Sequence, residues 1–182
     1  MLIRRLAYST VLVLAFVLSA CSSHPPMKTV EYVDLDRFSG DWYVIANIPT
    51  FIEKDAFNAL ESYQIGTNGT IETTFRFRKG NFDGPVKTYR PTGFVKDKQS
   101  NSLWGMQFIW PIKADYRIVY LDQQYENVII ARQARDYVWL MSRQPSMTDR
   151  EYREFTKMIS ELGYDVSKLQ RVLHQWPEKE GQ

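Results

Sequence analysis

Few side chains in this sequence have the types and spacing that catalysis or metal binding requires. The two histidines, His24 and His174, lie near opposite ends of the chain, and the only cysteine is Cys21. No Gly-x-Ser-x-Gly, His-Glu-x-x-His or P-loop pattern occurs. We therefore predict no catalytic residue, no metal site and no cofactor.

Glu61 and Arg132 are charged side chains whose positions suggest a role inside a folded domain. Alternate residues of a strand share a face, so Glu61 shares a face with Ala59 and Tyr63, and Arg132 shares one with Ile130. A charge on an inward face is costly unless it is paired or bound to a ligand headgroup. Arg132 could hold a carboxylate or a phosphate. We favour the alternative, in which one or both side chains lie in water at a rim.

Cys21 follows a short apolar run near the N-terminus. Arg4 and Arg5 precede residues 11–18, which are all apolar and too few to span a bilayer, for which roughly 20 are needed. A basic start, a short apolar run and small residues after it are typical of a secretory signal. The sequence Leu18-Ser19-Ala20-Cys21 resembles a bacterial lipobox, in which the cysteine is acylated and becomes the new N-terminus. An ordinary signal peptide or an uncleaved anchor is the alternative.

This interpretation divides the chain into a lipoprotein signal peptide at 1–20, an acylated N-terminus and tether at 21–31, and a single domain at 32–182. Ser22 and Ser23 after the cysteine imply sorting to the outer membrane, with the domain facing the periplasm and anchored through Cys21. Removal of the signal leaves 21 basic and 21 acidic residues. This balance argues against nucleic-acid binding, because no positive charge remains in excess to neutralise phosphates.

The domain alternates short β-rich runs with turn signals, which favours an antiparallel barrel or sandwich. In residues 71–78, the clearest strand, apolar side chains and Thr73 alternate with polar ones, and an Asn68-Gly69 turn precedes it. Eight strands are predicted, at 41–47, 59–65, 71–78, 86–95, 102–109, 116–122, 127–133 and 137–143. A helix is predicted at 149–162, because Thr148 and Glu151 form a capping box and the apolar residues that follow have helical spacing.

Three separated motifs resemble those of the lipocalin family. They are the first-strand segment 36–46 with Gly40-Asp41-Trp42-Tyr43, the turn at 120–125 and the last-strand segment 135–143, which ends in Arg143. The resemblance covers residues 31–172, and together with the lipobox it indicates the bacterial outer-membrane lipoprotein lipocalins. It implies an all-β fold: an eight-stranded antiparallel up-and-down barrel with one C-terminal α-helix packed on its outside.

In such a barrel Trp42 and Arg143 are expected to meet at the closed end as a cation–π pair that closes the barrel. The alternation of inward and outward side chains along each strand then gives the residues expected to line a ligand cavity. They are Val44, Ala46, Glu61, Tyr63, Ile71, Thr73, Phe75, Phe77, Met106, Phe108, Tyr116, Ile118, Arg132, Tyr137, Trp139 and Met141. These residues could instead simply fill a core, and the resemblance favours an open cavity.

The expected function is that of a membrane-anchored, non-enzymatic lipocalin. It would bind, store or transport a fatty acid or lysophospholipid in the cell envelope. The alternative is an isomerase or epoxide-modifying enzyme with the same fold, acting on an apolar substrate in the same cup. The sequence leaves the identity of the lipid open, and also whether the protein forms a homodimer.

Overall fold

The computed structural model describes residues 24–178, so the predicted signal segment and Cys21 lie outside the described residues. A short helix, α2 (Leu35–Phe38), leads into the sheet, and the helix α3 (Asp149–Glu161) follows its last long strand. The strands are β1 (Gly40–Ile48), β2 (Ala56–Ile65), β3 (Ile71–Lys79), β4 (Val86–Tyr89), β5 (Thr92–Val95), β6 (Leu103–Ile109), β7 (Ile112–Leu121), β8 (Asn127–Ala131), β9 (Val138–Ser142) and β10 (Gln170–Arg171).

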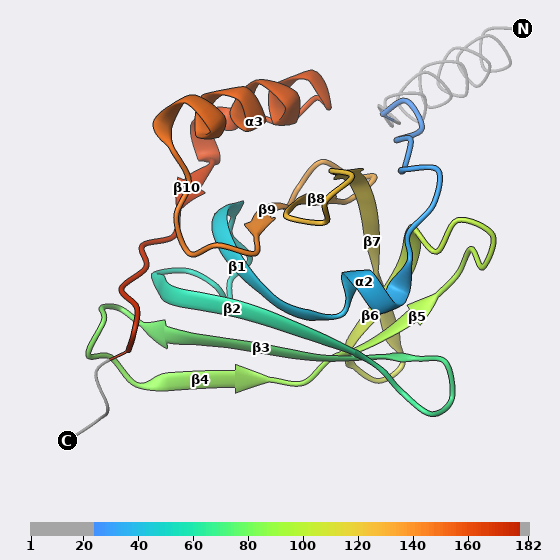
Figure 1. Ribbon diagram of the computed structural model, residues 1–182, viewed down its shortest axis with the longest axis horizontal. Helices are drawn as coiled ribbons and strands as arrows, with labels where there is room; N and C mark the ends of the chain where they lie inside the picture. Colours follow the sequence, from blue (N-terminus) through green and yellow to red (C-terminus); the bar gives the residue numbers. More distant parts are fainter. Residues whose placement is uncertain (1–23, 179–182) are drawn as a thin grey trace, which may run out of the picture.

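Antiparallel pairing closes these strands into a barrel. The sheet runs from β1 through β2, β3 and β5 to β9, and β9 pairs back onto β1 (Figure 1). β4 and β5 both pair with β3 and share one position in the wall. The barrel therefore has eight strand positions, and the predicted fold class is confirmed.

One predicted strand, 86–95, is wrong in detail, because β4 and β5 are separated by Arg90 and Pro91. Proline has no N–H to give to a neighbouring strand, and its ring fixes φ. The Pro91 carbonyl still accepts a hydrogen bond of 3.1 Å from the Thr73 N–H. The strand is therefore interrupted while the barrel wall stays continuous.

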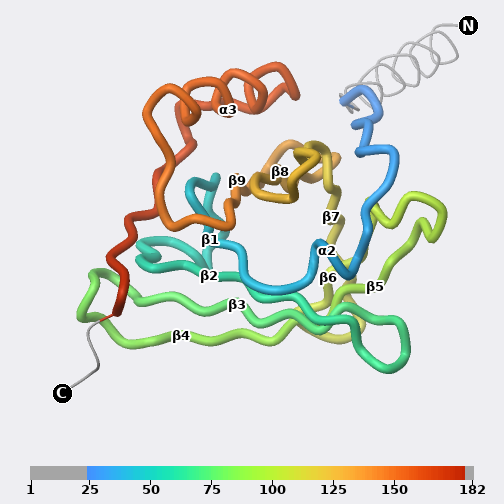
Figure 2. The backbone as a smooth tube through the Cα atoms, in the orientation of Figure 1, coloured from blue at the N-terminus to red at the C-terminus, as the bar shows by residue number. Residues whose placement is uncertain are grey.

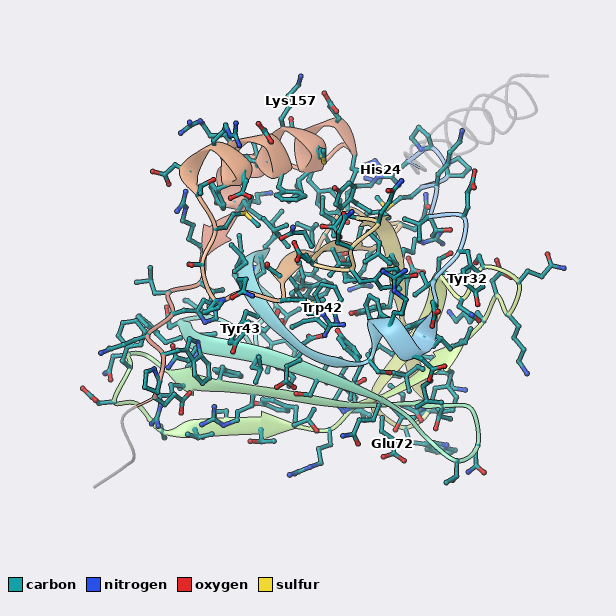
Figure 3. All side chains as sticks on the ribbon, in the orientation of Figure 1. His24, Tyr32, Trp42, Tyr43, Glu72 and Lys157 are labelled. Atoms are coloured by element: carbon teal, nitrogen blue, oxygen red, sulfur yellow. The ribbon has the colours of Figure 1, made fainter. Side chains whose placement is uncertain are left out.

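The predicted helix is confirmed at Asp149–Glu161, on the outside of the barrel. Thr148 and Glu151 form the capping box, in which each side chain bonds the other residue's backbone N–H. Phe155 and Ile159 are buried against the sheet, whereas Lys157 points away from it (Figure 3). The apolar face of the helix thus packs on the protein's own barrel.

The buried side chains form two clusters, one inside the barrel and one between the barrel and α3. Val44 belongs to the inner cluster, but Ala46 belongs to the outer one. The pairing of β1 with β9 shifts register between Val44 and Ala46. Such a bulge reverses the alternation of side chains along a strand. Ala46 is therefore not on the inner face, where simple alternation placed it.

The segment before α2, part of which we expected to be a tether, packs along the outside of the barrel. The Met27 N–H donates to the side-chain oxygen of Gln133 at 2.9 Å, and Met27 is buried. Farther along, the Val30 N–H donates to the Ile118 carbonyl at 2.9 Å. The segment therefore follows β7 from the loop that joins β8 and β9 toward α2.

The chain after α3 runs over the outer surface of the barrel on its way to the C-terminus (Figure 2). His174 Nε2 bonds the Val44 carbonyl at 2.8 Å, and the ring is largely buried. The Glu178 carboxylate accepts from both terminal nitrogens of Arg76, at 2.5 and 2.8 Å. These contacts secure the C-terminal segment to β1 and β3.

Candidate functional site

A cavity of about 240 Å³ opens at the end of the barrel where the loops 49–55, 110–111 and 132–137 lie. The opposite, closed end carries α2. The cavity wall is mainly apolar and aromatic. Its lining residues are Thr50, Phe51, Ile52, Glu53, Glu61, Thr73, Phe75, Pro91, Met106, Phe108, Ile109, Ala114, Asp115, Tyr116, Arg132, Tyr137 and Trp139.

Nine of the sixteen cavity residues that were predicted from the alternation of side chains along the strands lie on this wall. They are Glu61, Thr73, Phe75, Met106, Phe108, Tyr116, Arg132, Tyr137 and Trp139. Six others, Val44, Tyr63, Ile71, Phe77, Ile118 and Met141, are buried in the inner cluster without lining the cavity. Ala46 lies outside the barrel wall, under α3. Alternation identifies a face of the sheet, but it does not say how far along the barrel the interior is filled.

The closed half of the interior is filled by packed aromatic rings. Phe38, from α2, has its ring centroid 5.1 Å from that of Trp42, 5.3 Å from Tyr63 and 5.5 Å from Trp104. Figure 3 shows Trp42 inside the barrel near α2. Interiors of this kind are packed to crystal-like density. The space for a ligand is therefore confined to the open half.

Arg143 covers the closed end. Its guanidinium carbon lies 3.8 Å from the centroid of the Trp42 ring, in cation–π geometry. The same guanidinium donates to the carbonyls of Asp41 at 2.7 Å, Arg37 at 2.8 Å and Ser39 at 3.0 Å. The side chain thus ties the entry of the first strand to the end of the last one, and it is not among the residues that line the cavity.

Glu61 lies in the interior, at the base of the cavity. Its Oε2 accepts a hydrogen bond from the Tyr63 hydroxyl, which in turn lies 2.5 Å from the Tyr116 hydroxyl. Burial in this apolar environment raises the pKa of Glu61 to about 8, and the nearby Glu53 adds to the rise. The sequence predicts that one or both of Glu61 and Arg132 lie in water at the rim. Glu61 is buried, with 8% of its surface exposed, whereas the Arg132 side chain is partly exposed.

Glu53 is a second buried carboxyl on the cavity wall. Side-chain alternation along strands could not predict it, because Glu53 lies in the β1–β2 loop. Its Oε1 accepts from the Trp139 indole N–H at 2.6 Å, and its Oε2 accepts from the Thr50 N–H at 2.9 Å. Burial raises the pKa of Glu53, against the opposing effect of these hydrogen bonds. The hydrogen bond from Trp139 thereby fastens the β1–β2 loop to β9.

Arg132 stands near the opening. One terminal nitrogen pairs with Asp136 at 3.2 Å, and the guanidinium lies 5.3 Å from the Tyr137 ring centroid. Its Nε is buried and has no hydrogen-bond partner among the described residues. Asp115, another wall residue, is already paired with Arg117 at 2.9 Å. Among the described residues, Arg132 is therefore the cationic side chain on the cavity wall that has an N–H donor without a hydrogen-bond partner.

The rim of the opening carries exposed apolar side chains. Phe51 is 86% exposed and Trp110 is 83% exposed, and Ile109 and Ile112 beside Trp110 are also exposed. Within residues 24–178, no three or more histidine, cysteine or acidic side chains are grouped so as to hold a metal ion. No helix in this part of the chain is long and apolar enough to cross a membrane.

The family model for the lipocalin-like domain matches residues 33–174. This chain belongs to the lipocalin-like family. Temperature-induced lipocalin-1 of Arabidopsis thaliana is 29% identical over 152 residues, which cover 80% of this chain and 82% of the relative. The outer membrane lipoprotein Blc of Citrobacter freundii is 28% identical, with 85% of this chain and 89% of the relative covered. This lipocalin is thus similar both to a plant lipocalin and to a bacterial Blc lipoprotein.

Solved structures agree on the fold. Insecticyanin from the tobacco hornworm Manduca sexta superposes with a TM-score of 0.67 at 15% identity, covering 86% of this chain and 89% of insecticyanin. The cockroach allergen Per a 4 gives a TM-score of 0.61 at 17% identity, covering 85% of this chain and 98% of the allergen. Together with the apolar cavity, the family assigns this lipocalin a role in binding hydrophobic ligands.

Proposed function

We propose that this lipocalin is a membrane-anchored, non-enzymatic carrier that binds a single-chain lipid, such as a fatty acid or a lysophospholipid, in its barrel cavity. The observation that carries the proposal is the aromatic and apolar cavity at the open end, lined by residues of five strands and of the loops between them. Transfer of one methylene group from water to such a wall contributes roughly 0.8 kcal/mol. Eight buried methylenes would then contribute roughly 6 kcal/mol before the cost of ordering the chain.

Arg132 is the residue that we assign to a carboxylate or phosphate headgroup. Its unpartnered Nε and its place on the wall near the opening support this role. Charge-assisted hydrogen bonds of this kind are about twice as strong as neutral ones. The acyl chain would lie against Phe75, Met106 and Trp139 while the headgroup stays near water.

Acylation of Cys21, which lies outside the described residues, would anchor the domain to the outer membrane on its periplasmic side. The relatives named outer membrane lipoprotein Blc support this location. The described chain begins at His24, whose carbonyl accepts from Gln133 in the β8–β9 loop at 3.1 Å. Cys21 precedes His24 by three residues, a reach of roughly 10 Å at most. The anchor would therefore hold the open end and its exposed apolar rim near the bilayer.

Two experiments test the proposal. Lipids extracted from the purified protein should contain a single-chain species in stoichiometric amount, identified by mass spectrometry. A protein free of lipid that also takes up none on incubation would contradict the carrier role. In cell fractionation, Cys21→Ala should leave the membrane fraction while the protein stays folded. Unchanged membrane association of that variant would contradict the anchor alone.

A further inference from the structure

At the base of the cavity, one carboxyl oxygen receives no hydrogen bond from any described residue. Glu61 Oε2 is engaged by the Tyr63 hydroxyl. The Tyr63 hydroxyl is also hydrogen-bonded to the Tyr116 hydroxyl, so both phenol groups are engaged with each other or with Glu61. Glu61 Oε1 receives no hydrogen bond from residues 24–178, and Glu61 lies on the cavity wall. The free acceptor therefore faces the space that a ligand would occupy.

No cation within the described barrel compensates this carboxyl. Glu53, the other buried carboxyl on the wall, is close enough to influence the ionisation of Glu61. Arg132, the cation on the wall, is paired with Asp136 and forms no ion pair with Glu61. Two buried carboxyls without a basic partner are costly in an apolar cavity, unless a ligand supplies the positive charge.

Aromatic rings surround the same region. The Tyr116 ring stacks on Trp139, with centroids 6.4 Å apart, and Trp139 lies 6.4 Å from Tyr137. All three side chains line the cavity. Aromatic faces attract cations, and the attraction is stronger where water is excluded. Carboxyls at the base and aromatic walls are together the chemistry that recognises an ammonium group.

We propose that the base of the cavity binds a protonated amine on an apolar body, with the ammonium group at Glu61 and Glu53. The inference rests on the proposed carrier function, and it adds a class of headgroup that the base of the cavity, away from Arg132, would recognise. The cavity, at about 240 Å³, is slightly smaller than the ~300–1,000 Å³ range of typical ligand sites. A medium-chain alkyl amine suits it, whereas a carboxylate would be repelled from the base. The raised pKa of Glu61 agrees with a carboxyl that lacks its cation when the cavity is empty.

The test compares three ligands of equal chain length. Decylamine, decanol and decanoate would each displace a neutral apolar fluorescent probe from the purified protein at pH 7. We expect decylamine to act at a concentration roughly tenfold lower than decanol, equivalent to about 1.4 kcal/mol, whereas decanoate would place its carboxylate at Arg132 and its chain toward the base. Equal potency of decylamine and decanol on the wild type would overturn the amine site, without any variant being needed. Failure of the probe and of all three ligands to bind would overturn the carrier function itself.

Glu61→Gln should remove the preference for the amine, because it keeps the shape of the side chain and loses the charge. The matched control is Glu72→Gln, which removes a carboxylate from the outer face of β3, where Figure 3 shows Glu72 pointing away from the barrel. That control should keep the tenfold preference. An amine preference that survives in folded Glu61→Gln would place the ammonium group elsewhere and refute the assignment.

Discussion

The buried carboxyl of Glu61 makes a direct prediction about how stability depends on pH. In the folded protein its pKa is raised to about 8 from an ordinary value of 4.5, chiefly by burial. The folded state therefore holds this proton more tightly than the unfolded state does. The stability that the protonated carboxyl provides is fully present below about pH 4.5, and it is lost as pH rises through 8.

The size of the effect follows from the shift. At 1.36 kcal/mol per pKa unit, the rise from 4.5 to about 8 corresponds to roughly 5 kcal/mol of unfolding free energy, as an upper estimate. The glutamine introduced by Glu61→Gln cannot ionise, and it presents a neutral amide to Tyr63. The variant should match wild type within about 1 kcal/mol at pH 5 and exceed it by several kcal/mol at pH 9.

Urea unfolding of both proteins at pH 5, 7 and 9 measures this difference. Glu53, whose pKa is also raised, and the Tyr116 hydroxyl face the same region from the β1–β2 loop and from β7. Both groups are present in wild type and variant, so their own contributions largely cancel in the comparison. If the two proteins lost stability equally between pH 5 and 9, Glu61 would be an ionised, solvated side chain, and the description of the cavity base would be wrong.

Three further variants test other parts of the structure. Arg143→Ala should lower the unfolding free energy by roughly 1–3 kcal/mol through loss of packing on Trp42 and of its hydrogen bonds; a melting temperature equal to wild type in calorimetry would argue against the barrel-closing role. Trp139→Phe should cost roughly 1–3 kcal/mol, because Glu53 Oε1 loses its donor in a buried place; chemical denaturation that shows no change would mean that water replaces the indole. Burial lowers the pKa of His174 from its ordinary value of 6.5, so stability is lost as pH falls through 6.5. His174→Gln should lose less stability than wild type between pH 7 and 5, and equal losses would show that the ring is solvated.

The barrel itself was predictable because its signals are local. Alternation in residues 71–78, the Asn68-Gly69 turn and the Thr148 capping box each fix an element without reference to the rest of the chain. The meeting of Arg143 with Trp42 depends on long-range geometry. It was available only through the resemblance of the first and last strands to a known family.

The depth of the cavity was not predictable from alternation. Tyr63 and Glu61 share a face of β2, yet Glu61 lines the cavity and Tyr63 packs against Phe38 in the filled half. Which level of the interior is filled depends on α2, whose Phe38 occupies space that no strand pattern reports. Ala46 shows a second limit, because a bulge moved it across the wall. Glu53 could not be predicted either, because it lies in a loop, where side chains do not alternate between two faces.

The central claim is that a lipid binds inside the barrel, and titration with a fluorescent fatty-acid probe tests it most directly. Phe75 is 2% exposed on the cavity wall, and Thr74 beside it lies on the opposite face of β3. Phe75→Glu should weaken probe binding at least roughly tenfold, the equivalent of about 1.4 kcal/mol, because a buried charge would face the acyl chain. Thr74→Glu, which adds the same charge outside, should bind as wild type does. Equal binding by folded Phe75→Glu and wild type would contradict a lipid site in the barrel.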